Sequence, residues 1–341
     1  MNFFGDDSAE NGLVEALVLN GKGGARKVLR ADLAQLVLEP NETLWLHWDR
    51  SHEQAQAWLH QESGLNDFVC NLLLEESTRP RMVSVEQNQL LLFLRGINLQ
   101  PGAEPEDMIS LRIFADKNRV FSFRLRALRA RVEISAELMA GKGAVSSHAL
   151  VLRFAELMTA KIDPVIAELA EAVDAEDELI DADENYQPNH SNMVVARRRS
   201  AGLRRFLAPQ RDIYFEFAKD KLAWFVGENA KEWNELGNRL TRHLEEMELI
   251  RERVGLVLEA EHQRTDKKMN RVMYMFAIIT GFFLPLSFFT GLLGINVGGI
   301  PASKNLFGFE AFCIFLVVVG GFQWWLFRRL NRVRAHTRRG G

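Results

Sequence analysis

The chain has 341 residues, of which 47% are hydrophobic and 26% are charged, with a formal net charge of −3. This content is too apolar for a disordered chain, and its two cysteines cannot form a disulfide scaffold. The near-neutral charge gives no reason to expect a nucleic-acid partner. The averages conceal an uneven distribution, because a largely uncharged region follows residue 272.

The first 145 residues predict a cytosolic domain that mixes strands and helices. Residues 13–19 alternate in polarity and meet Asn20-Gly21, which predicts a hairpin with 26–29. A helix is expected over 52–61, with Asp49 or Ser51 as its cap. Further strands are expected over 43–48, 90–94, 109–114 and 119–125, the last two joined by a turn at 116–118. This order of elements predicts an α+β domain with an α/β/α-like arrangement.

His47, Asp49 and His52 lie close together in this domain and have side chains that bind metal ions. His47 and Asp49 share one face of the predicted strand, but no His-x-x-x-His pair on a helix accompanies them. Two interpretations stay open, a metal site or ordinary polar residues at the end of a strand.

Residues 146–270 carry no strand signal and predict long cytosolic helices. Acidic residues cluster at 174–184 and basic residues at 197–205, which predicts a helical hairpin whose oppositely charged arms attract each other. The acidic arm either attracts divalent cations or is a solvated complementary face. No strong helix breaker lies between Lys219 and Pro285, so one helix is expected over 219–294, roughly 110 Å long. A helix of this length needs lateral partners, most simply copies of the same chain.

Two uncharged segments near the C-terminus are long enough to cross a membrane. Residues 272–297 exceed the roughly 20 apolar residues that a spanning helix needs, and 311–327 form the second segment. We therefore expect a first transmembrane pore helix at 271–296, a periplasmic loop at 297–309, a second transmembrane helix at 310–328 and a basic cytosolic tail at 329–341. Basic residues precede the first span and follow the second. The positive-inside rule therefore places both chain termini in the cytoplasm. A helical hairpin buried in a soluble core is the alternative.

One face of the first span carries hydroxyl groups. Thr280 and Ser287 are seven residues apart, as expected if this face meets water in a pore. The alternative is that both hydroxyls bond back to the helix or pack at a helix contact. The expected pore-lining positions are Met273, Phe276, Thr280, Leu284, Ser287 and Gly291. At the cytosolic pore entrance, Glu259, His262 and Asp266 provide oxygen and nitrogen ligands for cations.

The tripeptide Gly294-Ile295-Asn296 ends the first span. The carbonyl oxygen of the Asn296 side chain can contact a hydrated cation without binding it irreversibly. The same tripeptide occurs at Gly96-Ile97-Asn98 in the soluble part, so it indicates a pore mouth only at the end of a membrane helix.

Gly294-Ile295-Asn296 resembles the Gly-x-Asn signature of the CorA-type metal ion transporter family. The segments at 290–301 (TGLLGINVGGIP), 75–81 (EESTRPR) and 208–212 (APQRD) are similar to its zinc transporter branch, the ZntB proteins, as is Ile295 in the middle of the signature. The resemblance implies a funnel-shaped homopentamer in the cell inner membrane, with Asn296 at the outer mouth of the pore. It further implies transport of Zn²⁺, with Cd²⁺ or Ni²⁺ as further substrates, and proton-coupled uptake.

The spans themselves offer few zinc ligands. Only Cys313 and Glu310 have side chains of the types that bind zinc tightly, and both lie on the second span. We therefore expect Zn²⁺ to pass largely hydrated, as a substrate and not as a cofactor. No nucleophile–base grouping or phosphate-binding loop predicts an enzyme. The alternatives are a membrane-tethered cytosolic sensor or scaffold, a Mg²⁺ or Co²⁺ channel of the same family, and zinc efflux.

Overall fold

The computed structural model describes residues 10–76, 79–85, 88–183, 186–219, 229–295 and 306–337, with side chains as far as residue 329. Two compact units divide the chain, Met1–Glu259 and Ala260–Gly341. Helix α7 (Ala230–Gly294) has residues in both units, and α8 (Gly308–Thr337) lies in the second. Each unit is described by itself below.

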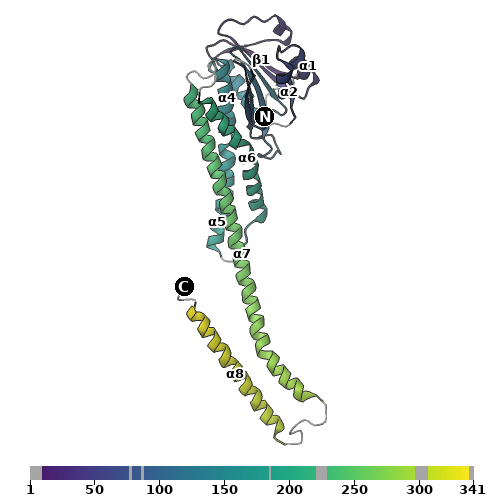
Figure 1. The fold of residues 1–341 in the computed structure, drawn as a ribbon, viewed down its shortest axis with the longest axis vertical. Coiled ribbons are helices and arrows are strands. Elements are labelled where there is room, and N and C mark those ends of the chain that lie inside the picture. The colour runs from purple at the N-terminus through teal and green to yellow at the C-terminus, as the bar shows by residue number, and fades with distance from the viewer. Residues whose placement is uncertain are drawn as a thin grey trace. The chain divides into compact units, whose positions relative to one another are not determined.

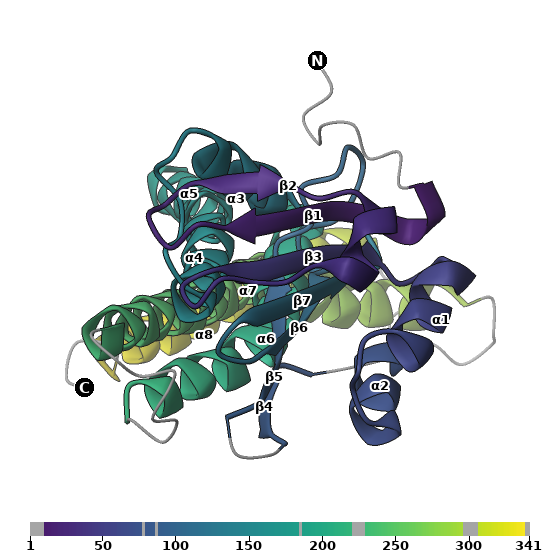
Figure 2. The same ribbon diagram turned by 90° about the horizontal axis from the view of Figure 1, so that it is seen from above.

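The first unit is built on a seven-stranded mixed sheet. Its strand order is β2-β1-β3-β7-β6-β5-β4 (Figure 2). β1 pairs with β2 and β3 antiparallel, β3 pairs with β7 parallel, and the remaining pairs are antiparallel. The predicted hairpin and all the predicted strands are confirmed. The strands are β1 (Leu13–Leu19), β2 (Ala25–Lys27), β3 (Thr43–Asp49), β4 (Arg81–Ser84), β5 (Leu90–Gly96), β6 (Ile109–Ala115) and β7 (Arg119–Arg124).

Helices cover both faces of this sheet. Helices α1 (Glu53–Gln61) and α2 (Asp67–Leu74) lie on one side, and α3 (Arg129–Met139) and α4 (Ser147–Ala160) lie on the other (Figure 2). Helices α5 (Asp163–Ala182) and α6 (His190–Phe217) follow in the chain, and α6 contacts β4 and β5. Two short 3₁₀ helices span Glu10–Gly12 and Arg30–Gln35. The expected α/β/α-like arrangement is therefore confirmed.

Aromatic side chains fill the core on both faces of the sheet. Trp48 is fully buried and stacks on Trp58 of α1 with ring centroids 4.5 Å apart, while Trp58 meets Phe121 edge-on at 5.2 Å. On the opposite face, Trp45 meets Phe154 of α4 edge-on at 5.6 Å. Burial of such large side chains supplies much of the free energy that holds the helices to the sheet.

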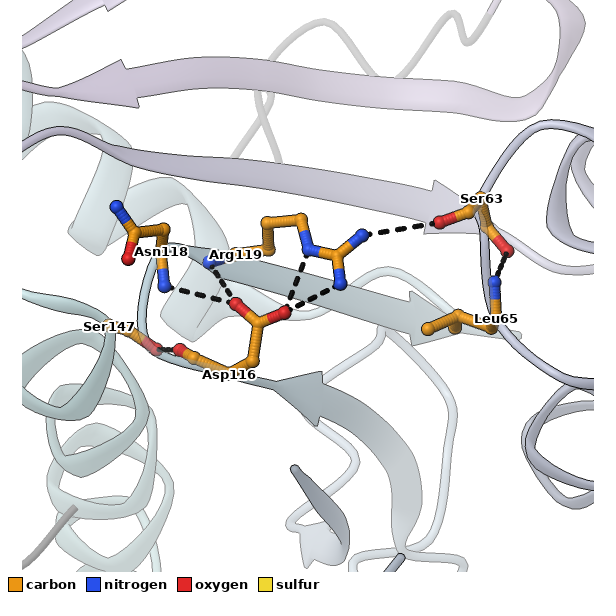
Figure 3. Close-up of polar contacts among 6 residues, drawn as sticks. All are labelled: Ser63, Leu65, Asp116, Asn118, Arg119 and Ser147. Carbon is orange, nitrogen blue, oxygen red and sulfur yellow. Dashed lines mark hydrogen bonds and ion pairs between the residues drawn. The ribbon is translucent and has the colours of Figure 1, made fainter. Parts of the chain in front are cut away.

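The β6–β7 turn connects the sheet to two other segments through Asp116 (Figure 3). One carboxylate oxygen of Asp116 accepts hydrogen bonds from the backbone N–H groups of Asn118 (3.0 Å) and Arg119 (2.7 Å), while the other accepts one from the Arg119 guanidinium (2.8 Å). The backbone oxygen of Asp116 accepts a hydrogen bond from the Ser147 hydroxyl at the start of α4 (2.5 Å). Arg119 also reaches the backbone oxygen of Ser63, after α1, at 3.5 Å. The predicted turn therefore also holds the helices at its two sides.

The predicted cap of the first helix is wrong. α1 begins at Glu53, and its N-cap residue, His52, makes no side-chain capping hydrogen bond. Asp49 instead accepts hydrogen bonds from the backbone N–H (3.0 Å) and hydroxyl (2.6 Å) of Ser51, because its carboxylate folds back on its own turn.

The helical region departs from the sequence prediction in two places. A break at Lys161 and Ile162 divides 146–184 into α4 and α5, and Pro164 stands in the first turn of α5. The predicted start of the long helix at Lys219 is also wrong, since Lys219 lies in the turn after α6 and α7 begins at Ala230. α7 does continue through Pro285 to Gly294 as one helix of 65 residues.

The expected charge attraction between the two helical arms is not what the structure gives. α5 and α6 bury apolar residues, and the described ion pairs of the arginines in 197–205 lie outside the hairpin, although Glu168 of α5 attracts Arg199 at longer range. Arg198 and Arg199 form ion pairs with Glu104 and Glu106 of the β5–β6 connection. Two further ion pairs join the hairpin to α7: Arg204 pairs with Glu248, and Asp174 pairs with Arg253.

Candidate functional site

Two helices in the described part of the chain are long and apolar enough to cross a membrane. They are α7 and the part of α8 that spans Gly308–Arg329. In each helix, the most apolar segment of 18 residues is not buried inside the chain. Both predicted spans therefore form helices of sufficient length and composition.

α8 packs along one face of the final part of α7 in the second unit (Figure 1). Phe289 meets Phe315 edge-on with ring centroids 5.1 Å apart. Two glycines lie beside aromatic rings of the other helix: a Cβ on Gly281 would lie 3.5 Å from the Phe327 ring, and a Cβ on Gly320 would lie 3.7 Å from Phe282, both ordinary contact distances. These contacts run in opposite directions along the two helices, so the helices are antiparallel. The sequence analysis did not predict a role for these glycines. Small residues are enriched where membrane helices contact each other, and this is the signal that could have identified them.

The six predicted pore-lining positions lie on the other side of α7. At about 100° per residue, Phe282 and Phe289 are rotated by roughly 180–200° from Thr280. The five side chains and Gly291 are exposed in the single chain, with Met273 at 63% and Leu284 at 65%. We call Met273, Phe276, Thr280, Leu284, Ser287 and Gly291 the 273–291 stripe. The packing against α8 therefore leaves this stripe uncovered.

The hydroxyl groups near the stripe behave differently from one another. The Thr290 hydroxyl donates a hydrogen bond to the backbone oxygen of Ser287 at 3.0 Å, which is the back-bonding that a helix allows. In the part of the chain that the structure describes, the hydroxyls of Thr280 and Ser287 make no such bond. Both remain available to water or to another chain.

The tripeptide at the end of the first span is only partly described. Gly294 is the last residue of α7, and Ile295 follows it with half of its side chain exposed. Asn296 lies outside the described residues, and the predicted loop is described only from residue 306.

The predicted cytosolic entrance consists of exposed α7 side chains. Glu259, His262 and Asp266 are all exposed. Among the described residues, no group of three or more His, Cys, Asp or Glu side chains is arranged to hold a metal ion. The three residues therefore do not form a metal site within one chain.

His47, Asp49 and His52 are not brought together either. His47 is fully buried beneath α3 and α4, and its Nδ1 lies 2.8 Å from the Ser122 hydroxyl. Burial, with the positive charges of Arg124 and Arg131, holds the pKa of His47 well below its ordinary value, so its imidazole is neutral. Asp49 lies 4.0 Å from the Arg124 guanidinium, and His52 is exposed.

The buried polar row around His47 includes a pair that sequence reasoning missed. Glu15 and Ser122 stand beside His47 on neighbouring strands, and Arg131 of α3 pairs with Glu15 at 3.4 Å. Glu15 and Arg131 are both less than a tenth exposed. Their separation by 116 positions means that only the fold makes the pair visible.

Comparison with known proteins gives the chain its relatives. Residues 40–329 match the family described as CorA-like Mg²⁺ transporter protein. The divalent cation transporter CmaX of Pseudomonas aeruginosa is 55% identical, over 94% of this chain and 97% of that protein. The zinc transport protein ZntB of Pectobacterium carotovorum is 33% identical, over 96% of this chain and 98% of that protein.

A solved structure supports the same relationship. The structure of the full-length CmaX protein superposes with a TM-score of 0.85 at 54% identity, covering 96% of this chain and all of that one. The sheet flanked by helices, the long α7 and the antiparallel α8 thus recur in a solved relative. The chain belongs to the CorA-like Mg²⁺ transporter family.

Proposed function

We propose that this chain transports divalent cations across the inner membrane, with Zn²⁺ as the main substrate and Cd²⁺ or Ni²⁺ as further ones. Five copies form the pore, and uptake is coupled to protons. Membership of the CorA-like family supports transport, and the 33% identity to a protein named for zinc transport supports the substrate. The names of the relatives also keep Mg²⁺ in the set of cations to be tested.

The observation that carries the proposal is the uncovered 273–291 stripe on α7. An apolar helix that only anchors a domain has no need for hydroxyl groups on the face that its partner helix leaves free. If copies of α7 surround an axis with this face inward, Thr280 and Ser287 form rings about 10 Å apart along the pore. Glu259, His262 and Asp266 then repeat around the cytosolic entrance, where their charge and ligand atoms concentrate cations.

The proposed arrangement keeps the domain boundaries expected from the sequence. The α/β domain (1–145) and the long-helix region (146–270) lie in the cytosol. The pore helix (271–296) and the second span (310–328) cross the membrane, joined by the periplasmic loop (297–309). The basic tail (329–341) returns the C-terminus to the cytosol, and Asn296 stands at the outer mouth.

A flux assay in proteoliposomes tests this function. The full chain is reconstituted with a fluorescent Zn²⁺ indicator inside the vesicles, and the outside is made acidic. We expect Zn²⁺ influx that is faster with the pH gradient than without it, and a proton ionophore should remove the difference. If Mg²⁺ or Co²⁺ crossed faster than Zn²⁺, that cation would be the main substrate in place of Zn²⁺. Absence of flux for every cation would favour a membrane tether over a transporter.

Matched variants connect the flux to the proposed pore. Asn296→Ala should reduce Zn²⁺ flux at least tenfold, whereas Asn98→Ala changes the same tripeptide in the soluble part and should have little effect. Thr280→Val should reduce flux, while Ile278→Val, about 160° away on the same helix, should not. Equal flux in both members of a pair would contradict the corresponding pore position. Native mass spectrometry should find five copies of the 38.9 kDa chain.

A further inference from the structure

Three strands of the first unit end at one edge of the sheet with an arginine. β3 and β7 are parallel neighbours, and β5 runs in the same direction because both β5 and β7 are antiparallel to β6. Arg50 follows β3 directly, Arg126 lies two residues after β7, and Arg95 is next to last in β5. The carboxyl ends of strands are where open sheets of this kind bind ligands.

These arginines line a cavity of about 520 Å³. Helix α6 closes one side with Arg205, Phe206 and Gly202, and the segment before β6 closes another. Close packing shapes this wall, since a Cβ on Gly202 would lie 2.9 Å from the Cβ of Glu106. We call this space the arginine cavity. Its volume falls within the range of about 300–1,000 Å³ that is typical of small-molecule sites.

The guanidinium groups are close enough to repel one another. Burial, together with the charges of Arg50 and Arg205, lowers the pKa of Arg95. Arg112, buried in β6 behind the cavity, has its pKa lowered to about 9 by burial and by the charges of Arg50 and Arg95. This mutual repulsion of the guanidinium groups indicates a positive electrostatic potential at this edge of the sheet. A bound anion would reduce the repulsion.

Carboxylates in the lining offset this charge only in part, and the negative charge of Glu76 favours the charged form of Arg50. Glu76, Glu106 and Asp107 also line the cavity. Glu106 is engaged by Arg198 at 3.2 Å and Arg199 at 3.3 Å, so its charge is offset by arginines outside the lining. Within the part of the chain that the structure describes, neither Arg126 nor Arg205 lies within 4.0 Å of a carboxylate.

Several of the guanidinium groups are held in place by other contacts. Arg95 donates to the backbone oxygen of Met108 at 3.0 Å and lies 4.9 Å above the Phe206 ring. Arg205 lies 5.5 Å from the same ring, and Arg50 donates to the backbone oxygen of Leu74 at 3.2 Å. Stacking on an aromatic ring fixes the plane of a guanidinium without using its N–H groups. A planar set of N–H donors matches phosphate oxygens in pairs.

We propose that the arginine cavity binds a small soluble phosphorylated anion, a phosphate monoester or diphosphate with at least two negative charges. Four lining arginines outnumber the three lining carboxylates, and one of these, Glu106, is already paired with Arg198 and Arg199. The proposal concerns a ligand of the cytosolic unit, and it stands or fails separately from the choice of transported cation.

Calorimetric titration of the full chain in a nonionic detergent tests the proposal. Inorganic diphosphate and ADP are the probes, EDTA removes divalent cations, and sulfate at matched ionic strength is the comparison anion. The proposal expects one site per chain for diphosphate or ADP, with affinity that falls as salt is raised. Sulfate should bind at least tenfold more weakly than diphosphate.

Variants locate the site. Arg126→Gln combined with Arg205→Gln should lower the affinity for diphosphate at least tenfold, and Arg126 in particular can be changed without removing an ion pair. Arg26→Gln, an exposed arginine paired with Glu42 before β3, removes the same kind of charge elsewhere and should change the affinity less than twofold. Unchanged affinity in the double variant, equal binding of sulfate and diphosphate, or absence of binding to the unmodified chain would each overturn the proposal.

Discussion

Protonation of His148 should loosen the contact between α4 and α7. His148, in the first turn of α4, is only 8% exposed, and its Nε2 accepts a hydrogen bond from the Trp233 indole N–H at 3.0 Å. Because an indole only donates, Nε2 must be unprotonated and the proton of the neutral ring lies on Nδ1. The Asn229 side-chain amide lies 3.2 Å from Nδ1, and with the proton on Nδ1 it is the amide oxygen that accepts the hydrogen bond once the amide is turned.

The structure sets the size and sign of the effect. Burial lowers the pKa of His148 from 6.5 to about 4, with a smaller opposing influence of Glu232. The unfolded chain therefore binds a proton between pH 6.5 and 4 that the folded chain does not, so stability falls as the pH falls through this range. Between pH 7.5 and 5.0 the loss is about 2 kcal/mol. For a unit of this size, that corresponds to a decrease in Tm of about 4–8 °C.

Thermal unfolding of the full chain in nonionic detergent, followed by near-ultraviolet circular dichroism, measures this effect. His148→Gln keeps a hydrogen-bond acceptor but cannot titrate, so its Tm should fall less than that of the unmodified chain between pH 7.5 and 5.0. His52→Gln removes an exposed histidine and should leave the pH dependence unchanged. If the unmodified chain and His148→Gln lost the same number of degrees, the assignment of a neutral His148 would be refuted.

Three further predictions concern packing and hydrogen bonding. Asp116→Ala removes three hydrogen bonds around the β6–β7 turn, including that from the Arg119 guanidinium, and should cost about 2–3 kcal/mol in urea unfolding, whereas Asp116→Asn should cost less. Gly281→Ala should keep the Tm within about 2 °C in detergent, since its Cβ would lie at an ordinary 3.5 Å from Phe327, but Gly281→Leu should lower it clearly. The Cys70 thiol is fully buried and its pKa is raised by burial, so a disulfide reagent should modify it at least about 100-fold more slowly in the folded chain than in urea, as measured by mass spectrometry.

Strands and membrane helices could be predicted here because their signals are local. The alternation in 13–19 with Asn20-Gly21 specifies a hairpin within 15 residues, and a long uncharged segment specifies a span by itself. The cap of α1 was predicted wrongly because the Asp49 carboxylate could accept hydrogen bonds either from the first turn of α1 or from Ser51. The sequence does not show which of the two it prefers. The pairing of the α6 arginines was missed because their partners, Glu104 and Glu106, are supplied by the fold.

The arginine cavity shows the same limit for a candidate site. Its arginines lie at positions 50, 95, 126 and 205, each in an unremarkable local context. Only the strand order, with β3, β5 and β7 ending at one edge, brings three of them together. The 273–291 stripe is the opposite case, because helical periodicity within one segment was enough to define it. What the sequence could not specify was which face of α7 packs against α8.

That last point bears more directly than length or composition on the choice between the proposed pore and a tether. Two antiparallel helices that only anchor a domain can bury any pair of faces, and lipid covers the remainder. Here Phe282 and Phe289 face α8, so the side of α7 that carries Thr280 and Ser287 stays exposed. Hydroxyl groups facing hydrocarbon without a partner cost free energy, whereas hydroxyl groups facing water or a neighbouring chain do not. We therefore propose that this side of α7 meets something other than lipid, and copies of the same helix around an aqueous axis would meet that requirement.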